Sequence, residues 1–271
     1  MRYPIAAGHF YPAEKNDLHA AIKGCFLHRL GPGLPECMGD ERTISGIIAP
    51  HAGYAASGMN AAHAYRKIAE DGLPEAYIII GPDHRGIPYR AVMCIDDFLT
   101  PLGPCGIHED IASELMETIP NDCEAHRFEH SIEVQIPFIQ FIDKDPKIVP
   151  IIMRDQSMEA AENLATAVKK VCRSRDVVII ASSDMSHYVP KGDAERMNGM
   201  VLERIKEKDI TGMYSAVRKY GISVCGYGPM AAAMLGSGAS RIEILKYSDS
   251  WDSLGYGLDS VVGYGSAAMY R

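Results

Sequence analysis

Residues 43–51 read TISGIIAPH, an apolar and β-branched run that ends in a histidine. The same arrangement occurs twice more, because residues 77–84 read YIIIGPDH and residues 177–187 read VVIIASSDMSH. Each run has the length and composition of a buried strand in a mostly parallel sheet. In open α/β sheets, ligands bind in the crevice outside the carboxyl ends of the strands. The three runs therefore predict both a fold class and the edge of the sheet where a site lies.

The histidines that end these runs are His51, His84 and His187. Any one of them alone is better explained as a hydrogen-bonded loop histidine than as a site residue. Three at equivalent positions favour a shared site, and a metal site in particular, since imidazole is a common metal ligand.

Strands and helices are predicted to alternate along the whole chain. Strands are expected at 44–49, 76–81, 90–95, 147–153, 176–182, 241–247 and 260–269. Helices are expected at 14–29, 56–70, 108–118, 130–142, 158–173, 193–206, 208–219 and 226–237. This alternation predicts a single α/β domain over residues 1–271, with a mixed, largely parallel sheet and helices on both faces.

The bulk composition excludes several classes of partner. The chain has 271 residues, 47% of them hydrophobic, and a formal net charge of −8. No Lys/Arg run marks a nucleic-acid surface, and no stretch is apolar for long enough to span a membrane. The first residues lack the apolar core of a signal peptide, so a cytoplasmic protein is expected.

Seven cysteines are present, an odd number, and none are spaced C-x-x-C. The odd count argues against a disulfide framework, and the lack of C-x-x-C pairs argues against a structural zinc ribbon. A reducing cytoplasm is the simplest compartment for such a chain.

Two segments place further chemistry near the predicted strand ends. Asp184 lies three residues before His187, so a helical turn would put both on one face, where the carboxylate could orient the imidazole. The alternative is an N-cap role for Ser183 or Asp184, and both roles can hold together. Glu129, His130 and Glu133 open the segment EHSIEVQIPFIQFI, a predicted helix that Pro137 would kink or end. These side chains could reach the site or could simply begin an amphipathic helix.

Cys225 lies in SVCGYGPM, just before a predicted alanine-rich helix. A thiol at a helix N-terminus has a lowered pKa, which favours metal binding or nucleophilic chemistry. A small buried hydrophobe is the alternative interpretation of this cysteine.

Several motifs, taken in order, resemble the Memo protein family. They are GHFYP (8–12), IAPHAGY (48–54) with SG (57–58), GPDH (81–84), EHSIEVQIPF (129–138), SSDMSH (182–187) and CGYGP (225–229). The resemblance covers nearly the whole chain. It implies a LigB-like fold similar to that of the class III extradiol ring-cleaving dioxygenases, which are non-haem iron enzymes.

The resemblance also implies a set of site residues. The family's metal positions fall on His51, His84 and Cys225, with Asp184 and His187 lining the same pocket. His130 falls in a flanking signature and is included with the predicted catalytic groups. A cysteine stands where the dioxygenases have a carboxylate. In prokaryotes the family is often encoded with a radical-SAM partner, which implies a shared pathway. The loop with Trp251 and Tyr256 departs from the family pattern and is expected to alter the pocket rim.

Three functions follow from this reading. The first is a metal-dependent, dioxygenase-like oxidoreductase that holds a divalent ion, Fe(II) foremost with Cu or Zn as alternatives, and acts on a small hydroxylated or aromatic molecule. His187, backed by Asp184, would be its general base. The second is a binding protein that uses the pocket for a metal or peptide without turnover. The third is a zinc hydrolase with one open metal position.

Overall fold

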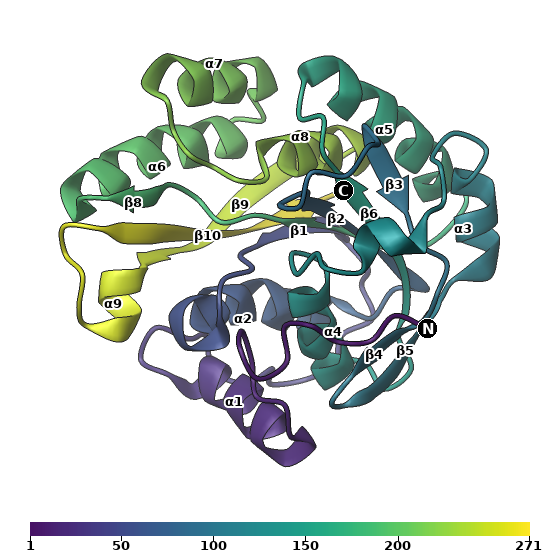
Figure 1. Cartoon of the computed structure of the whole chain (residues 1–271), viewed down its shortest axis with the longest axis horizontal. Helices are drawn as coiled ribbons and strands as arrows, with labels where there is room; N and C mark the ends of the chain where they lie inside the picture. Colours follow the sequence, from purple (N-terminus) through teal and green to yellow (C-terminus); the bar gives the residue numbers. More distant parts are fainter.

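A ten-stranded sheet forms the centre of the computed structural model, which describes residues 1–271 (Figure 1). The strands are β1 (Ile44–Ala49), β2 (Ala76–Pro82), β3 (Ala91–Met93), β4 (Phe98–Thr100), β5 (Gly103–Ile107), β6 (Lys147–Met153), β7 (Val177–Ser182), β8 (His187–Val189), β9 (Arg241–Asp249) and β10 (Val261–Tyr270). Their order is β4-β5-β6-β2-β7-β1-β10-β8, with β3 beside β6 and β9 beside β10. The run from β5 to β1 is parallel, and the remaining strands pair antiparallel at its margins.

Helices cover both faces of this sheet (Figure 1). They are α1 (Lys15–Leu27), α2 (Tyr54–Asp71), α3 (Glu109–Leu115), α4 (Ile136–Ile142), α5 (Met158–Cys172), α6 (Lys191–Lys206), α7 (Ile210–Tyr220), α8 (Tyr227–Gly236) and α9 (Ser250–Leu254), with 3-10 turns η1 (Cys123–His126) and η2 (Glu133–Gln135). Helices α1, α2 and α4 pack together on one face, and α5 to α8 lie on the other. No helix combines the length and the apolar character needed to cross a bilayer. The predicted mixed α/β fold class is confirmed.

Strands β1, β2 and β7 lie in the middle of the sheet, and every residue in them is buried. Strands covered on both faces cannot alternate polar and apolar side chains, so they read as continuous apolar runs. This is why the runs are visible in the sequence.

The carboxyl ends of these three strands lie level with one another. Ala49 of β1 pairs with Ser182 of β7, and Ile80 of β2 pairs with Ala181 of β7. Loops that follow the three strands therefore leave the sheet at one edge, as the sequence predicts.

The short elements differ from the prediction. Strands β4, β5 and β8 and helix α9 were not expected, and His187 begins β8 instead of ending β7. Pro137 neither kinks nor ends its helix but lies in the first turn of α4. A proline is tolerated there because the first N–H groups of a helix have no partner within the helix.

The sequence argues against a disulfide framework, and the structure contains a single disulfide. Cys94 and Cys123 form a disulfide, with their Cα atoms 4.5 Å apart. An isolated bridge between Met93 and Asn121 brings the two segments side by side. The pairing joins residues 29 apart, and cysteine spacing alone gives no sign of such a contact. The other five cysteines are free.

Candidate metal centre

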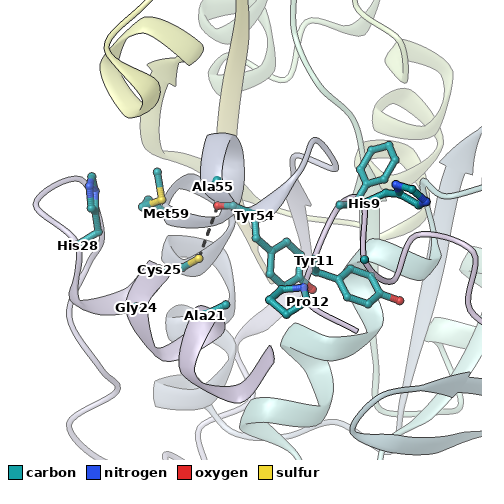
Figure 2. A pocket seen from close by; sticks show the side chains of 12 residues that line it. His9, Tyr11, Pro12, Ala21, Gly24, Cys25, His28, Tyr54, Ala55 and Met59 are labelled. Carbon is teal, nitrogen blue, oxygen red and sulfur yellow. Dashed lines mark hydrogen bonds between the residues drawn. The ribbon is translucent and has the colours of Figure 1, made fainter. Parts of the chain in front are cut away.

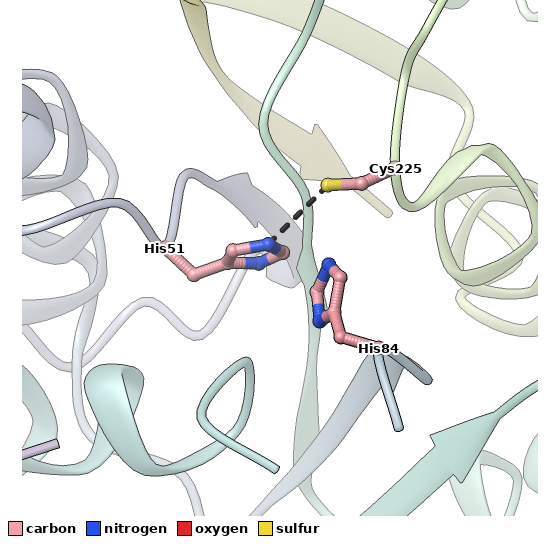
Figure 3. Close-up of side chains that lie close together, drawn as sticks. All are labelled: His51, His84 and Cys225. Carbon is pink, nitrogen blue, oxygen red and sulfur yellow. Dashed lines mark hydrogen bonds between the residues drawn. The ribbon is translucent and has the colours of Figure 1, made fainter. Parts of the chain in front are cut away.

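The three predicted metal ligands converge at this edge of the sheet. His51 follows β1, His84 follows β2, and Cys225 lies in the loop before α8. Their ligand atoms all lie within 4.8 Å of one another. Figure 3 shows the two rings and the thiol directed toward a common point. His51 is buried, Cys225 is partly buried and His84 is exposed, so the cluster is open to solvent on the His84 side.

The donor set fits a metal ion. His51 Nε2 and Cys225 Sγ are 3.3 Å apart. Ligands at the bond lengths typical of tetrahedral zinc would lie about 3.5 Å apart, so a small shift admits an ion. Two imidazoles and a thiolate suit iron, copper and zinc, and three protein ligands leave a position open.

His51 is fixed by a buried hydrogen-bond network. Its Nδ1 pairs with Ser182 Oγ at 2.8 Å, and Ser182 Oγ donates to the Ser131 carbonyl and accepts from Gln135 Nε2. Burial lowers the pKa of His51 to about 3, so the ring is neutral at pH 7. A neutral imidazole has a free lone pair for a metal.

His84 is held by a carboxylate instead of a hydroxyl. Its Nδ1 lies 2.9 Å from Glu129 Oε1, and its backbone N–H donates to Glu129 Oε2 at 2.7 Å. Burial opposes a charge on the His84 ring, but the hydrogen bond and negative charge of Glu129 outweigh it and raise the pKa of His84. Burial likewise opposes ionisation of Glu129, yet His84 lowers the pKa of Glu129 to about 2.

Cys225 lies against the segment that follows β7. Its Sγ accepts the backbone N–H of Asp184 at 3.2 Å. Gly226 allows this approach, since a Cβ there would lie 2.6 Å from the Ser182 carbonyl oxygen. The expected lowering of the Cys225 pKa is wrong: burial, with the nearby Asp184 charge, raises it. Desolvation dominates because the thiol precedes the N-cap of α8 and is not in its first turn.

Asp184 and His187 do not share a helical face, because residues 183–186 are not helical. Asp184 is buried, and its Oδ1 accepts the backbone N–H of His51 at 2.9 Å. His187 Nδ1 lies 2.8 Å from the Ser223 carbonyl oxygen, so that nitrogen carries the proton and Nε2 has a free lone pair. Asp184 therefore shapes the His51 loop, and a backbone carbonyl orients His187.

His130 lies within a stack of rings beside the cluster. Its ring centroid is 4.8 Å from that of His84 and 4.4 Å from that of Phe10. His51 meets the His130 ring edge-on, with centroids 5.4 Å apart. Burial, with some repulsion from His51, lowers the pKa of His130 to about 4, so this ring is also neutral at pH 7.

Glu133, considered with Glu129 as a group that could reach the site, points elsewhere. It is fully buried, forms an ion pair with Arg2, and accepts the hydroxyl of Tyr11 and the backbone N–H of Ala6. It thereby fixes the N-terminal segment, and with it Phe10. The sequence analysis did not identify Phe10 and Gln135 as supports of the site. Phe10 lies in the GHFYP motif, and Gln135 lies in the EHSIEVQIPF motif.

A groove of about 620 Å³ lies between the N-terminal segment, α1 and α2. Figure 2 shows His9 and His28 at its two ends, with Cys25, Tyr54 and Met59 between them. Phe10 belongs both to the lining of this groove and to the ring stack at the cluster. The groove contains none of the three converging ligands.

Comparison with known proteins agrees with the motifs. A family model described as Memo-like protein matches residues 2–268. The chain belongs to the Memo family. A MEMO1 family protein of Methanopyrus kandleri is 40% identical over 281 residues, covering 100% of this chain and 99% of the relative. Memo-family proteins of Methanobrevibacter smithii and Thermotoga neapolitana are also 40% identical, with 98% and 99% of both chains covered, respectively.

The fold also occurs outside close Memo relatives. The crystal structure of an uncharacterized protein from Escherichia coli K12 matches with a TM-score of 0.50 at 16% identity. The match covers 71% of this chain and 86% of that one. It bears on the fold alone.

Proposed function

We propose that this Memo-family chain binds one divalent ion through His51, His84 and Cys225 and acts as a non-haem iron oxidoreductase. The observation that carries the proposal is the convergence of these three ligands within 4.8 Å at the carboxyl edge of the sheet. The substrate class that we propose is a small hydroxylated or aromatic molecule, reaching the ion from the exposed His84 side.

A bound iron ion would supply redox chemistry and a position for substrate or oxygen. The chain supplies the rest of the site. His187 has a free Nε2 lone pair, and we assign it as the base that takes a proton from a substrate hydroxyl. The His130 ring, neutral and only partly exposed, forms one wall beside His84. The Cys225 thiol must lose its proton on metal binding, and the ion itself provides the driving force.

Metal analysis of protein purified without oxygen tests the proposal. We expect about one iron per chain and oxygen consumption with members of a panel of catechols and related phenols. Iron-loaded protein that neither changes its spectrum with catechols nor consumes oxygen would exclude ring cleavage. The protein would then be a metal-binding protein without turnover. Stable retention of zinc would support this alternative, because a thiolate ligand favours zinc.

A further inference from the structure

Glu129 is a buried carboxylate whose two oxygens both serve His84. Its exposed fraction is 1%. Oε2 accepts the backbone N–H of His84, and Oε1 accepts the ring Nδ1–H. Oε1 also accepts the backbone N–H of Ser131 at 2.8 Å, which anchors the carboxylate to its own loop. A buried carboxylate is costly unless paired, so this arrangement has to be retained for Glu129 to stay ionised.

These contacts fix both the position and the tautomer of His84. The backbone contact places the start of the side chain, and the ring contact sets its rotation. With the Nδ1 proton directed at Glu129, the lone pair is on Nε2, the nitrogen that remains for the cluster. The opposite tautomer would place the Nδ1 lone pair against a carboxylate oxygen, and repulsion excludes it.

His51 has no such partner. Its Nδ1 faces the neutral hydroxyl of Ser182, so negative charge lies behind only one of the two histidines. A carboxylate behind a ligand histidine increases the basicity of the coordinating nitrogen. His84 is therefore the stronger donor, although it is the more exposed of the two rings.

We propose that Glu129 is the positioning residue of the metal centre, holding His84 with Nε2 directed at the ion and increasing its donor strength. This inference rests on the proposed metal-binding function. It gives a role to a glutamate that the sequence alone could equally place at the start of an ordinary helix.

A second ion held by His84, Glu129 and His130 is the competing explanation, since their ligand atoms also lie within 4.8 Å of one another. The hydrogen bonds argue against it. Glu129 Oε1 already accepts from both Ser131 and His84, and His130 Nδ1 is 3.4 Å away. The stoichiometry of binding separates the two explanations.

The test compares Co(II) and Zn(II) affinities of the metal-free full-length chain and its Glu129→Gln variant by competition with a chelator. A glutamine has one acceptor oxygen for the two N–H groups of His84, so one contact is lost. We expect one ion per wild-type chain and an affinity about 10- to 100-fold lower in Glu129→Gln. Asp71→Asn is the matched control, because it makes the same carboxylate-to-amide change in a buried residue that accepts the backbone N–H groups of Thr43 and Ile44 at the opposite end of β1, and it should leave the affinity within about twofold of wild type.

Each outcome decides. Wild-type affinity in Glu129→Gln would overturn the inference while leaving the proposed function intact. Two ions per wild-type chain, one of them lost in Glu129→Gln, would overturn it in favour of the second site. A wild type that binds no ion would overturn the proposed function and the inference together. If Glu129→Gln does not fold, nitrogen-15 NMR of the metal-free wild type, recorded at a pH above the raised pKa of His84, gives the answer: an Nδ1–H tautomer at His84 supports the inference, and an Nε2–H tautomer overturns it.

Discussion

The three ligands of the candidate centre are held by three different kinds of partner. A hydroxyl holds His51, a carboxylate holds His84, and a backbone N–H lies against the sulfur of Cys225. None of these partners requires the ion to be present. The geometry is therefore prepared in advance, and loss of a ligand should remove the ion without dismantling the fold.

This division of roles gives the first prediction. His187→Ala should retain metal near the wild-type level while losing turnover. The His187 ring is hydrogen-bonded to the Ser223 carbonyl and is not one of the three converging ligands. His51→Ala and Cys225→Ala should lose the metal itself. Elemental analysis of the three purified variants checks this, and equal metal loss in all three would contradict it.

Gly226 gives a second prediction at the same scale. A Cβ at this position would lie 2.6 Å from the Ser182 carbonyl oxygen and 2.7 Å from Ser183 Cβ. Because backbone has to move, Gly226→Ala should lower the free energy of unfolding by about 1–3 kcal/mol and displace Cys225. Urea denaturation measures the change. Gly199→Ala is the control: nothing lies within 4 Å of that Cβ, and in the helix α6 it should stabilise by up to about 1 kcal/mol. A similar response of both variants would refute the steric argument.

At the scale of elements, the sequence predicts the long helices and the buried, apolar strands. The runs that become β1, β2 and β7 are visible because both faces of these strands are covered, and amphipathic helices such as α5 are visible through their periodicity. Strand β8 has no buried residue and therefore leaves no apolar pattern. The Asp184 turn and the Cys94–Cys123 disulfide depend on tertiary contacts that local sequence does not encode. The same limit applies to Glu129, whose partner is 45 residues away.

The N-terminal segment is an element without regular structure that is nevertheless firmly attached. Arg2 pairs with Glu133 in the interior and donates to the Glu129 carbonyl at 2.7 Å. Arg2→Ala would leave the Glu133 carboxylate buried without its cation. Such a loss should cost about 3–5 kcal/mol of unfolding free energy.

Urea denaturation of Arg2→Ala tests this expectation. Arg127→Ala is its control, because Arg127 pairs with Glu124 on the surface and the loss should be about 0–1 kcal/mol. A double variant, Arg2→Ala with Glu133→Gln, should recover part of the stability, since the uncompensated charge is gone. Equal losses in Arg2→Ala and Arg127→Ala would show that the buried pair contributes no more than a surface pair.

For the whole molecule, buried neutral histidines make stability depend on pH. Burial lowers the pKa values of three of them, to about 3 for His51 and about 4 for His126 and His130. In the unfolded chain these rings take up protons below about pH 6.5, so unfolding binds three protons. His84 acts in the opposite sense, because its pKa is raised in the folded state. That opposition is confined to the region near and above pH 6.5, because at lower pH the His84 ring is protonated in both states; there the uptake on unfolding is about three protons.

The metal-free protein should accordingly lose stability as the pH falls from about 6.5 toward 4. Three protons correspond to a slope of at most about 4 kcal/mol per pH unit. Urea denaturation midpoints at pH 7 and pH 5 measure the effect. A midpoint that stays constant, or rises at pH 5, would contradict the neutral state of these rings. Saturating metal should steepen the dependence, because the ligands must give up their protons to bind it.

The topology of the sheet also has a consequence for biosynthesis. The three candidate ligands lie at positions 51, 84 and 225, and the central strand β1 is flanked on one side by β10, which follows the other nine strands in the sequence. During synthesis both histidines therefore precede the thiol, and β1 gains its second neighbour only after β10 has been made. For the proposed metal centre, loading would accordingly follow the synthesis of β10, and a shortage of the ion would leave folded chains without metal.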